Sequence, residues 1–208
     1  MLTNIEYDVA LKAVFVIGYD SSQQRNALYR LSDVNGSLTM VAVVPGIVQV
    51  SESTYCPISH TFFCTVQTDS GSMNALVRVS VTEGRTLPAV PLVDSVEMLF
   101  WDYTSGDGVL YALIATETQA ALLVTIDPAT GKRNATLGSG FTNLSSNPNN
   151  GASAALNLKS KQLTGCFVDI STGNLDPYWI VMDARTGKAS AAAYAYGYAT
   201  NILVNAPQ

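Results

Sequence analysis

The sequence is poor in charged residues and in the side chains that most enzymes use at their active sites. Only 13% of its 208 residues are Asp, Glu, Lys or Arg, and it contains a single histidine, His60. Sixteen acidic against eleven basic residues give a net charge of −5, which disfavours binding to nucleic-acid phosphates or to anionic lipid. We expect no nucleic-acid partner, and the composition does not by itself define a biochemical function.

Long apolar segments are missing as well. A membrane-spanning helix needs about 18 consecutive apolar residues, whereas the richest runs, residues 40–44 and 120–124, have the length of a strand. We therefore expect no membrane insertion. Residues 1–8 carry acids and no basic residue, unlike a signal peptide; a cleaved signal or a longer parent chain stays open.

Cysteine is too scarce for a disulfide scaffold. Cys56 and Cys64 flank a short Pro-containing segment and could form a bridge, which would leave Cys166 over. The alternative is three free thiols that pack as small apolar residues. There is no Cys-x-x-Cys motif, and His60 is the one histidine near a cysteine, so we expect neither a metal site nor a cofactor.

Three Asn-x-Ser/Thr sequences mark glycosylation candidates, at Asn35, Asn134 and Asn143. Together with the small number of basic residues they favour an extracellular or cell-surface location. A cytoplasmic location is the alternative.

Internal repetition is the most informative feature that the sequence does have. Residues 26–32 (NALYRLS) and 74–80 (NALVRVS) share five of seven positions at a spacing of 48 residues. A third copy starts at Leu123, 47 residues after Leu76 of the second copy, and a fourth at Trp179, a further 56 residues on. Each copy is an apolar run followed by a turn and a glycine, which is typical of a β-hairpin.

Further strand-like runs precede and follow each of these hairpins. With four strands and about 48 residues in each copy, the repeat has the size of a propeller blade. We predict an all-β fold, a small β-propeller of four blades, each a four-stranded antiparallel sheet. The predicted blades cover residues 1–45, 46–93, 94–139 and 140–198 of a single domain, with 199–208 as a closing or exchanged strand. A β-trefoil is the best alternative fold, but it needs three copies.

Two of the hairpins carry a nameable motif. Residues 127–132 (DPATGK) and 183–188 (DARTGK) resemble the Asp-x-x-Thr-Gly-Lys hairpin of YVTN-type and quinoprotein-type propeller repeats. The Asp opens such a turn by binding its backbone, and the Gly takes the positive φ that ends it. The resemblance implies a propeller and carries no chemistry, because many functions use this fold.

The first blade has two candidates for its first strand. Residues 2–7 and residues 199–204 both fit that place, so one of them is a tail, pairs with another chain or belongs to a longer repeat array. We also predict that residues 142–151, which are rich in Asn, Ser and Pro, form a loop insertion in the fourth copy.

Aromatic residues are the best candidates for binding. Trp101 and Tyr103 precede a polar loop and could stack on sugar rings; in this alignment Trp101 matches Ser53, and Tyr103 matches Tyr55. His60 follows Pro57 in a predicted loop, where a lone histidine is expected at the surface.

The three tyrosines Tyr194, Tyr196 and Tyr198 alternate with Ala and Gly, so in a strand their rings would share one face. They suit either an exposed edge that binds a partner or packing against a neighbouring blade.

We read the chain as a non-catalytic interaction or assembly module with a protein partner or a second copy of itself. The alternative is a lectin-like propeller that binds glycans. No catalytic constellation is present in the sequence, and an enzyme would rest on fold analogy alone.

Overall fold

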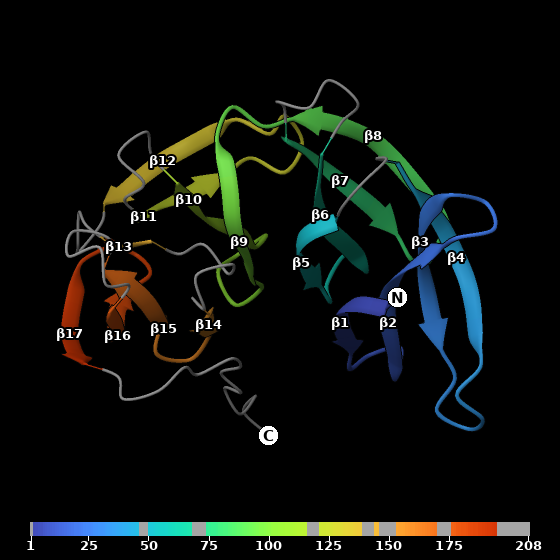
Figure 1. Ribbon diagram of the computed structural model, residues 1–208, viewed down its shortest axis with the longest axis horizontal. Helices are drawn as coiled ribbons and strands as arrows, with labels where there is room; N and C mark the ends of the chain where they lie inside the picture. The colour runs from blue at the N-terminus through green and yellow to red at the C-terminus, as the bar shows by residue number, and fades with distance from the viewer. Residues whose placement is uncertain are drawn as a thin grey trace. The chain divides into compact units, whose positions relative to one another are not determined.

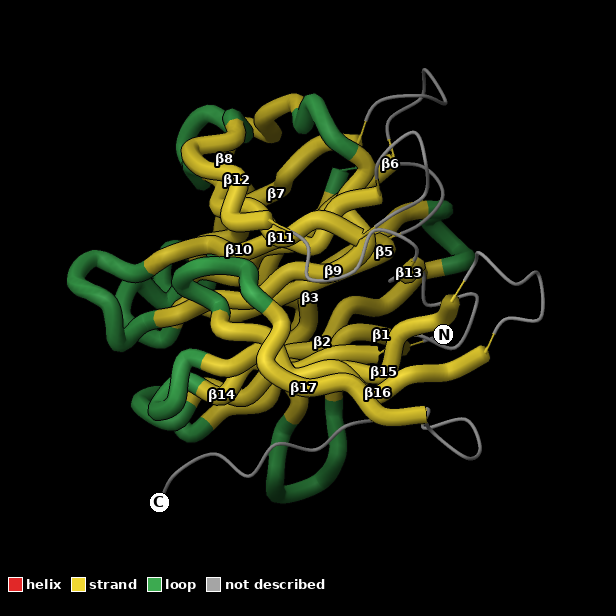
Figure 2. The backbone as a smooth tube through the Cα atoms, turned by 90° about the vertical axis from the view of Figure 1, so that its left-hand side faces the viewer, coloured by secondary structure: helices red, strands yellow, loops and turns green. Residues whose placement is uncertain are grey.

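The computed structural model describes residues 2–45, 50–67, 74–115, 121–138, 144–145, 153–169 and 176–194. All regular structure in these residues is β-strand, joined by loops and turns (Figure 2). No helix in this part of the chain is long and apolar enough to cross a membrane. The chain divides into two compact units, Met1–Val93 with Pro128–Lys132, and Asp94–Asp127 with Arg133–Gln208.

The first unit contains two four-stranded antiparallel sheets, and in each the strands pair in chain order (Figure 1). The first sheet consists of β1 (Leu2–Asp8), β2 (Ala13–Asp20), β3 (Arg25–Leu31) and β4 (Leu38–Val44). The second sheet consists of β5 (Val50–Cys56), β6 (Thr61–Gln67), β7 (Asn74–Ser80) and β8 (Arg85–Pro91).

The second unit contains the third and fourth sheets. The third sheet consists of β9 (Ser95–Asp102), β10 (Val109–Ala115), β11 (Ala121–Ile126) and β12 (Arg133–Gly138). The fourth sheet consists of β14 (Ser153–Asn157), β15 (Gln162–Asp169), β16 (Asp176–Asp183) and β17 (Ala189–Tyr194). A two-residue strand, β13 (Leu144–Ser145), also pairs with β15, on the same side as β14.

These four consecutive antiparallel meanders confirm the predicted class, an all-β propeller with four blades. The predicted loop insertion at residues 142–151 contributes Leu144 and Ser145 to the fourth sheet, where they pair with Asp169 and Val168. The first strand of the first blade is formed by Leu2–Asp8, and residues 199–208 lie outside the described part of the chain.

The hairpin motif forms the turn that its residue types predict. The Asp183 carboxylate accepts hydrogen bonds from the backbone N–H of Arg185 at 2.8 Å and of Thr186 at 3.2 Å. Gly187 ends the turn at φ +67°, a conformation in which a Cβ is strained. The corresponding glycines of the other blades also have positive φ: Gly36, Gly84 and Gly131.

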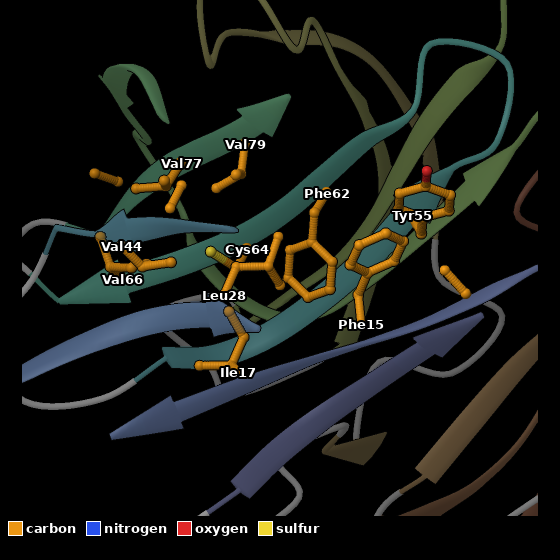
Figure 3. Close-up of a cluster of buried hydrophobic side chains, with 13 residues drawn as sticks. Phe15, Ile17, Leu28, Val44, Tyr55, Phe62, Cys64, Val66, Val77 and Val79 are labelled. Atoms are coloured by element: carbon orange, nitrogen blue, oxygen red, sulfur yellow. The ribbon is translucent and has the colours of Figure 1, made fainter. Parts of the chain in front are cut away.

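Sheet-on-sheet packing provides the core of the first unit. Phe15 and Ile17 of the first sheet face Phe62 and Cys64 of the second (Figure 3), and each of the four is at most 2% exposed. Across the same interface the rings of Phe15 and Tyr55 stack at a centroid distance of 5.9 Å. Because one face of each sheet is apolar, burying the two faces against each other removes both from water.

The second unit repeats this arrangement. Leu113 and Leu123 of the third sheet pack in one cluster with Leu163, Phe167 and Ile180 of the fourth. The three cysteines, Cys56, Cys64 and Cys166, are all buried and free, so the free-thiol interpretation describes this structure. Burial raises the pKa of the Cys64 thiol to about 12, which keeps it protonated and unreactive at neutral pH.

Two of the hairpin glycines differ in their surroundings and give a matched test. A Cβ on Gly187 would lie 2.4 Å from the Leu137 carbonyl oxygen, whereas a Cβ on Gly36 would meet nothing within 4 Å. Both Gly→Ala changes lose the positive-φ preference, at a cost of about 1 kcal/mol. We expect Gly187→Ala to lower the free energy of unfolding clearly more than Gly36→Ala does, as measured by urea titration. Equal losses would contradict the close approach at Gly187.

Candidate interaction surface

A buried carboxylate joins the first and second sheets. Asp8 ends β1, its side chain is fully buried, and its Oδ1 accepts hydrogen bonds from the backbone N–H of Ala10 and Leu11 at 2.8 and 2.9 Å. Its Oδ2 accepts from the Tyr55 hydroxyl and lies 2.7 Å from Nδ1 of His60, both on the second sheet or its turn. The carboxylate thus closes its own turn and also binds the neighbouring blade.

The pKa values reflect this environment. Burial alone would raise the pKa of Asp8, but the hydrogen bonds from Tyr55, Leu11, His60 and Ala10 outweigh it and lower the pKa. Burial, and the charge and hydrogen bonding of Asp8, raise the pKa of the Tyr55 hydroxyl far above its usual range. An ionised carboxylate can only accept hydrogen bonds. The His60 nitrogen that faces Asp8, Nδ1, therefore carries a hydrogen and donates it to the carboxylate.

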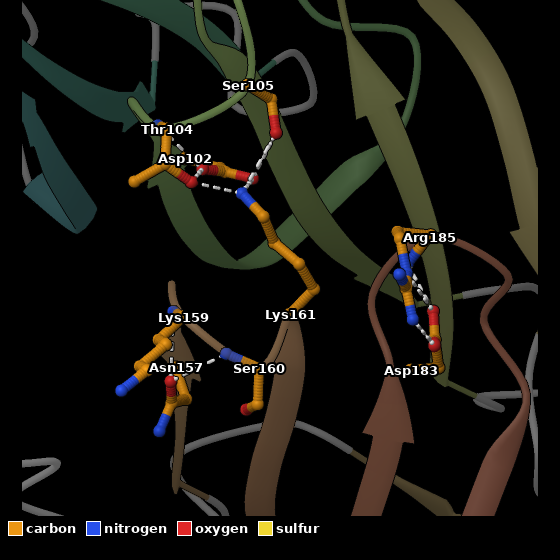
Figure 4. A network of polar contacts seen from close by, with 9 residues as sticks. All are labelled: Asp102, Thr104, Ser105, Asn157, Lys159, Ser160, Lys161, Asp183 and Arg185. Carbon is orange, nitrogen blue, oxygen red and sulfur yellow. Dashed lines mark hydrogen bonds and ion pairs between the residues drawn. The ribbon is translucent and has the colours of Figure 1, made fainter.

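The third and fourth sheets are joined in the same way (Figure 4). Asp102 ends β9 with a fully buried side chain and accepts from the Thr104 backbone N–H at 2.9 Å and the Ser105 hydroxyl at 2.8 Å. Lys161, in the turn between β14 and β15, forms an ion pair with Asp102 and donates to Ser105 at 2.9 Å. Burial would raise the pKa of Asp102, but the Lys161 ammonium and the turn hydrogen bonds lower it.

The donors occupy equivalent places in their blades. His60 and Lys161 each stand last in the turn between the first two strands, and both have the left-handed backbone conformation, with φ of 48° and 57°. This conformation is uncommon for residues other than glycine. The expectation that His60 is a surface residue holds only in part, because its side chain is half-buried, at 26% exposed, and is bound to Asp8.

Lys161 should be needed for the stability of the second unit. Lys161→Met keeps the length of the side chain but leaves the buried Asp102 without its cation, which we expect to cost about 3 kcal/mol of unfolding free energy. Lys159→Met, two residues earlier and exposed, is the matched control and should change stability by less than about 0.5 kcal/mol. Urea unfolding measures both. Similar values for the two variants would show that the ion pair contributes little.

A second carboxylate, that of Glu6, lies between the first and second sheets, where burial disfavours its charged form. Glu6 receives one hydrogen bond, from the Ser53 hydroxyl at 3.5 Å, and burial raises its pKa to about 7 from an ordinary value of 4.5. Because the folded state holds this proton more tightly than the unfolded state, the contribution of Glu6 is most favourable below pH 4.5 and is lost as the pH rises to about 7.

The variant Glu6→Gln tests this linkage. Between pH 4.5 and 7 the wild type should lose stability relative to Glu6→Gln, by at most about 1.4 kcal/mol per pH unit, with a constant difference above pH 7. Unfolding free energies across this range measure the effect, and the exposed Glu83→Gln provides the control. Parallel curves for wild type and Glu6→Gln would contradict the raised pKa.

The side of the first sheet that faces away from the second sheet is mostly apolar, although Asp20 pairs with Arg25 at one end of it and the Arg25 guanidinium lies 3.7 Å from the Met40 sulfur. Paired residues of antiparallel strands share a face, and here they form two cross-strand rows that contain no polar or charged position except the Tyr hydroxyls. We call this the outer face of the first sheet; its rows are Tyr7–Val14–Leu31–Leu38 and Ile5–Val16–Tyr29–Met40.

Exposure is concentrated on the two outer strands of this face. Ile5 and Tyr7 on β1 are 70% and 55% exposed, and Met40 on β4 is 47% exposed, while Val16 at the centre is buried. Among the described residues, nine of the twelve exposed large hydrophobic side chains belong to the first sheet and its turns. Single exposed apolar residues need no explanation, whereas contiguous exposed apolar patches are often places where proteins bind partners.

Of the two aromatic residues predicted to stack on sugar rings, Trp101 and Tyr103, only Tyr103 has an exposed ring. The alignment of Trp101 with Ser53 is wrong: Trp101 pairs with Leu110 as Tyr55 pairs with Phe62, so Trp101 is the counterpart of Tyr55. The turn after Asp102 is longer than the turn after Cys56, and this difference put the alignment of the two copies out of register. The Trp101 ring packs on Gly108, where a Cβ would lie 2.5 Å from the ring, and Tyr103 is 38% exposed.

The remaining predicted residues lie in different parts of the chain. Tyr194 ends β17 opposite Tyr178, whereas Tyr196, Tyr198 and Asn143 lie outside the described residues. Asn35 and Asn134 are exposed. Within the described ranges no three His, Cys, Asp or Glu side chains come together in a group that could hold a metal ion.

No protein-family model matches this sequence, and no curated protein sequence matches it. Solved structures match the fold. TolB from Acinetobacter baumannii matches with a TM-score of 0.63 at 10% identity, over 91% of this chain and 42% of TolB. The Dos1 propeller matches with a TM-score of 0.59 at 9% identity, over 95% and 48%.

An exo-β-1,3-galactanase from Phanerochaete chrysosporium matches with a TM-score of 0.58 at 14% identity, over 92% of this chain and 49% of the enzyme. The chain therefore spans less than half the length of these three proteins. Their functions differ, so the likeness establishes the propeller fold and leaves the function to the residues of this chain.

Proposed function

We propose that this propeller is a non-catalytic interaction module that associates with protein through the outer face of the first sheet. The observation that carries the proposal is the apolar character of the two cross-strand rows of that face, in which Ile5, Tyr7, Leu38 and Met40 are exposed. A surface of this kind is costly to leave in water, and burying it against another protein surface removes that cost.

The polar groups of the described chain support the same conclusion. The histidine and the buried carboxylates that a catalytic site would use are engaged in joining blades: Asp8 with His60, and Asp102 with Lys161. The pKa values of Asp8 and Asp102 are lowered by structural hydrogen bonds, whereas a general acid or base works best with a pKa near the working pH. The pKa of Glu6 is raised to about 7, and this carboxylate accepts from the Ser53 hydroxyl between the first and second sheets.

Glycan binding is the weaker candidate. Sugar-binding sites stack rings on exposed aromatic faces, and of the two predicted residues Trp101 packs on Gly108, which leaves Tyr103 as the exposed ring. A single half-exposed tyrosine is a small platform compared with the apolar outer face of the first sheet.

An apolar-surface dye tests the proposed surface directly. The dye 8-anilino-1-naphthalenesulfonate fluoresces on exposed apolar surface, and at low protein concentration we expect Tyr7→Lys/Met40→Lys to lose roughly half or more of the signal. Val34→Lys is the matched control, because Val34 is 89% exposed in a turn of the same sheet but outside this face.

Circular dichroism would show that the variants keep their β-structure. Equal dye fluorescence in wild type and the folded double variant would remove this face as the interaction surface.

A further inference from the structure

We propose that the outer face of the first sheet binds the same face of a second copy of this chain, around a two-fold axis that places Lys12 of each copy on Asp20 of the other. This inference rests on the proposed function and identifies the occupant of the same surface. Both charged residues belong to the first sheet: Lys12 directly precedes β2, and Asp20 ends it.

The outer face of the first sheet corresponds to a face of the second sheet that is covered. Lys12 and His60 stand last in the turns that precede β2 and β6. Counting from these two turns, Val16 occupies the place of Cys64. Cys64 is fully buried in the core that the first and second sheets share. The outer face of the first sheet is therefore the side on which a blade of this repeat receives another sheet.

Lys12 carries the cation of a sheet-joining contact without its carboxylate. It has the left-handed backbone conformation of His60 and Lys161, with φ of 46°. The side chains of His60 and Lys161 each bind a carboxylate of the sheet that packs on theirs. Lys12 is exposed, and no carboxylate among the described residues forms an ion pair with it. We therefore expect a sheet that covers the outer face to bring a carboxylate to Lys12.

The outer face itself has a suitable carboxylate at its other end. Asp20 and Val16 point to the same side of β2, because side chains alternate along a strand. The Asp20 Oδ1 accepts from the backbone N–H and the hydroxyl of Ser22, at 2.9 and 2.6 Å. Its Oδ2 accepts no hydrogen bond from the described residues, and the guanidinium of the neighbouring Arg25 lies against the Met40 sulfur on β4. One oxygen of Asp20 is thus open to a partner.

The two charges lie symmetrically about the centre of the face. Lys12 and Asp20 are each four residues from Val16 along the chain. A two-fold axis that crosses β2 at Val16, in the plane of contact and perpendicular to the strands, lays the β2 strands of two copies antiparallel on each other. Each Lys12 then faces Asp20 of the other copy, which gives two ion pairs. An axis parallel to the strands would bring the two Lys12 residues to the same end, so charge complementarity selects the first arrangement.

The apolar part of this contact is small. Ile5 and Met40 lie in the same cross-strand row as Val16, so this axis buries both of these exposed side chains against the other copy. Four strands of about seven residues cover roughly 23 by 19 Å, on the order of 400 Å² for one face. Interfaces that bury less than about 1,200 Å² in total are typical of weak, transient complexes. We therefore expect a reversible dimer that forms at high protein concentration.

Sedimentation velocity over a concentration series tests the inference with charge-reversed variants. We expect the wild type to dimerise at roughly 100 μM. Lys12→Asp and Asp20→Lys should each dimerise roughly tenfold or more weakly, because like charges then face each other. An equimolar mixture of the two variants, and the double variant Lys12→Asp/Asp20→Lys, should regain most of the dimer because opposite charges meet again. Lys159→Asp, an exposed change of the same charge, is the control and should dimerise like the wild type.

Each contrary result has a separate meaning. A wild type that stays monomeric at all concentrations while its outer face binds the dye overturns the second copy as partner and leaves the proposed function standing. A monomer without dye binding overturns both.

The charge variants also test the orientation of the pair. A dimer that Tyr7→Lys/Met40→Lys disrupts but neither charge variant weakens overturns the two-fold pairing of first sheets. Single variants that weaken the dimer without recovery in the mixture or in the double variant overturn the contact between Lys12 and Asp20. Circular dichroism of each variant excludes loss of fold as the cause.

Discussion

Each unit depends on a carboxylate that is taken out of water at the end of a strand and is then fully hydrogen-bonded. A buried charge is costly unless partners surround it, and Asp8 and Asp102 obtain theirs from two sources: their own turn and the next blade. The same group therefore fixes a local turn and the contact between two sheets. The apolar cores supply most of the burial, while these contacts define how one sheet meets the next.

The fold could be predicted from sequence because a propeller repeats its local chemistry. The NALYRLS and NALVRVS segments became β3 and β7, and the glycines after them took the positive φ that the turn requires. These signals lie within one hairpin, where residue spacing is a reliable guide to geometry. The exception was the longer turn after Asp102, which displaced Trp101 from its true counterpart, Tyr55.

The contacts between sheets could not be predicted in this way. Asp8 and His60 are 52 residues apart, and each alone has the properties of an ordinary turn residue. His60 in particular lacks any neighbouring motif, and its role appears only when the second sheet is laid on the first. The outer face of the first sheet could not be predicted either. Identifying it requires the register of four strands and the side of the sheet that the second sheet covers.

The carboxylate contact has a period of two blades. Asp8 and Asp102 are 94 residues apart, and Cys56, the residue in the corresponding place of the blade between them, is a buried thiol. The compact units also contain two blades each. Within each unit, one blade therefore supplies the acid and the other supplies the donor that binds it, so a single polar contact of the same kind holds the two sheets together.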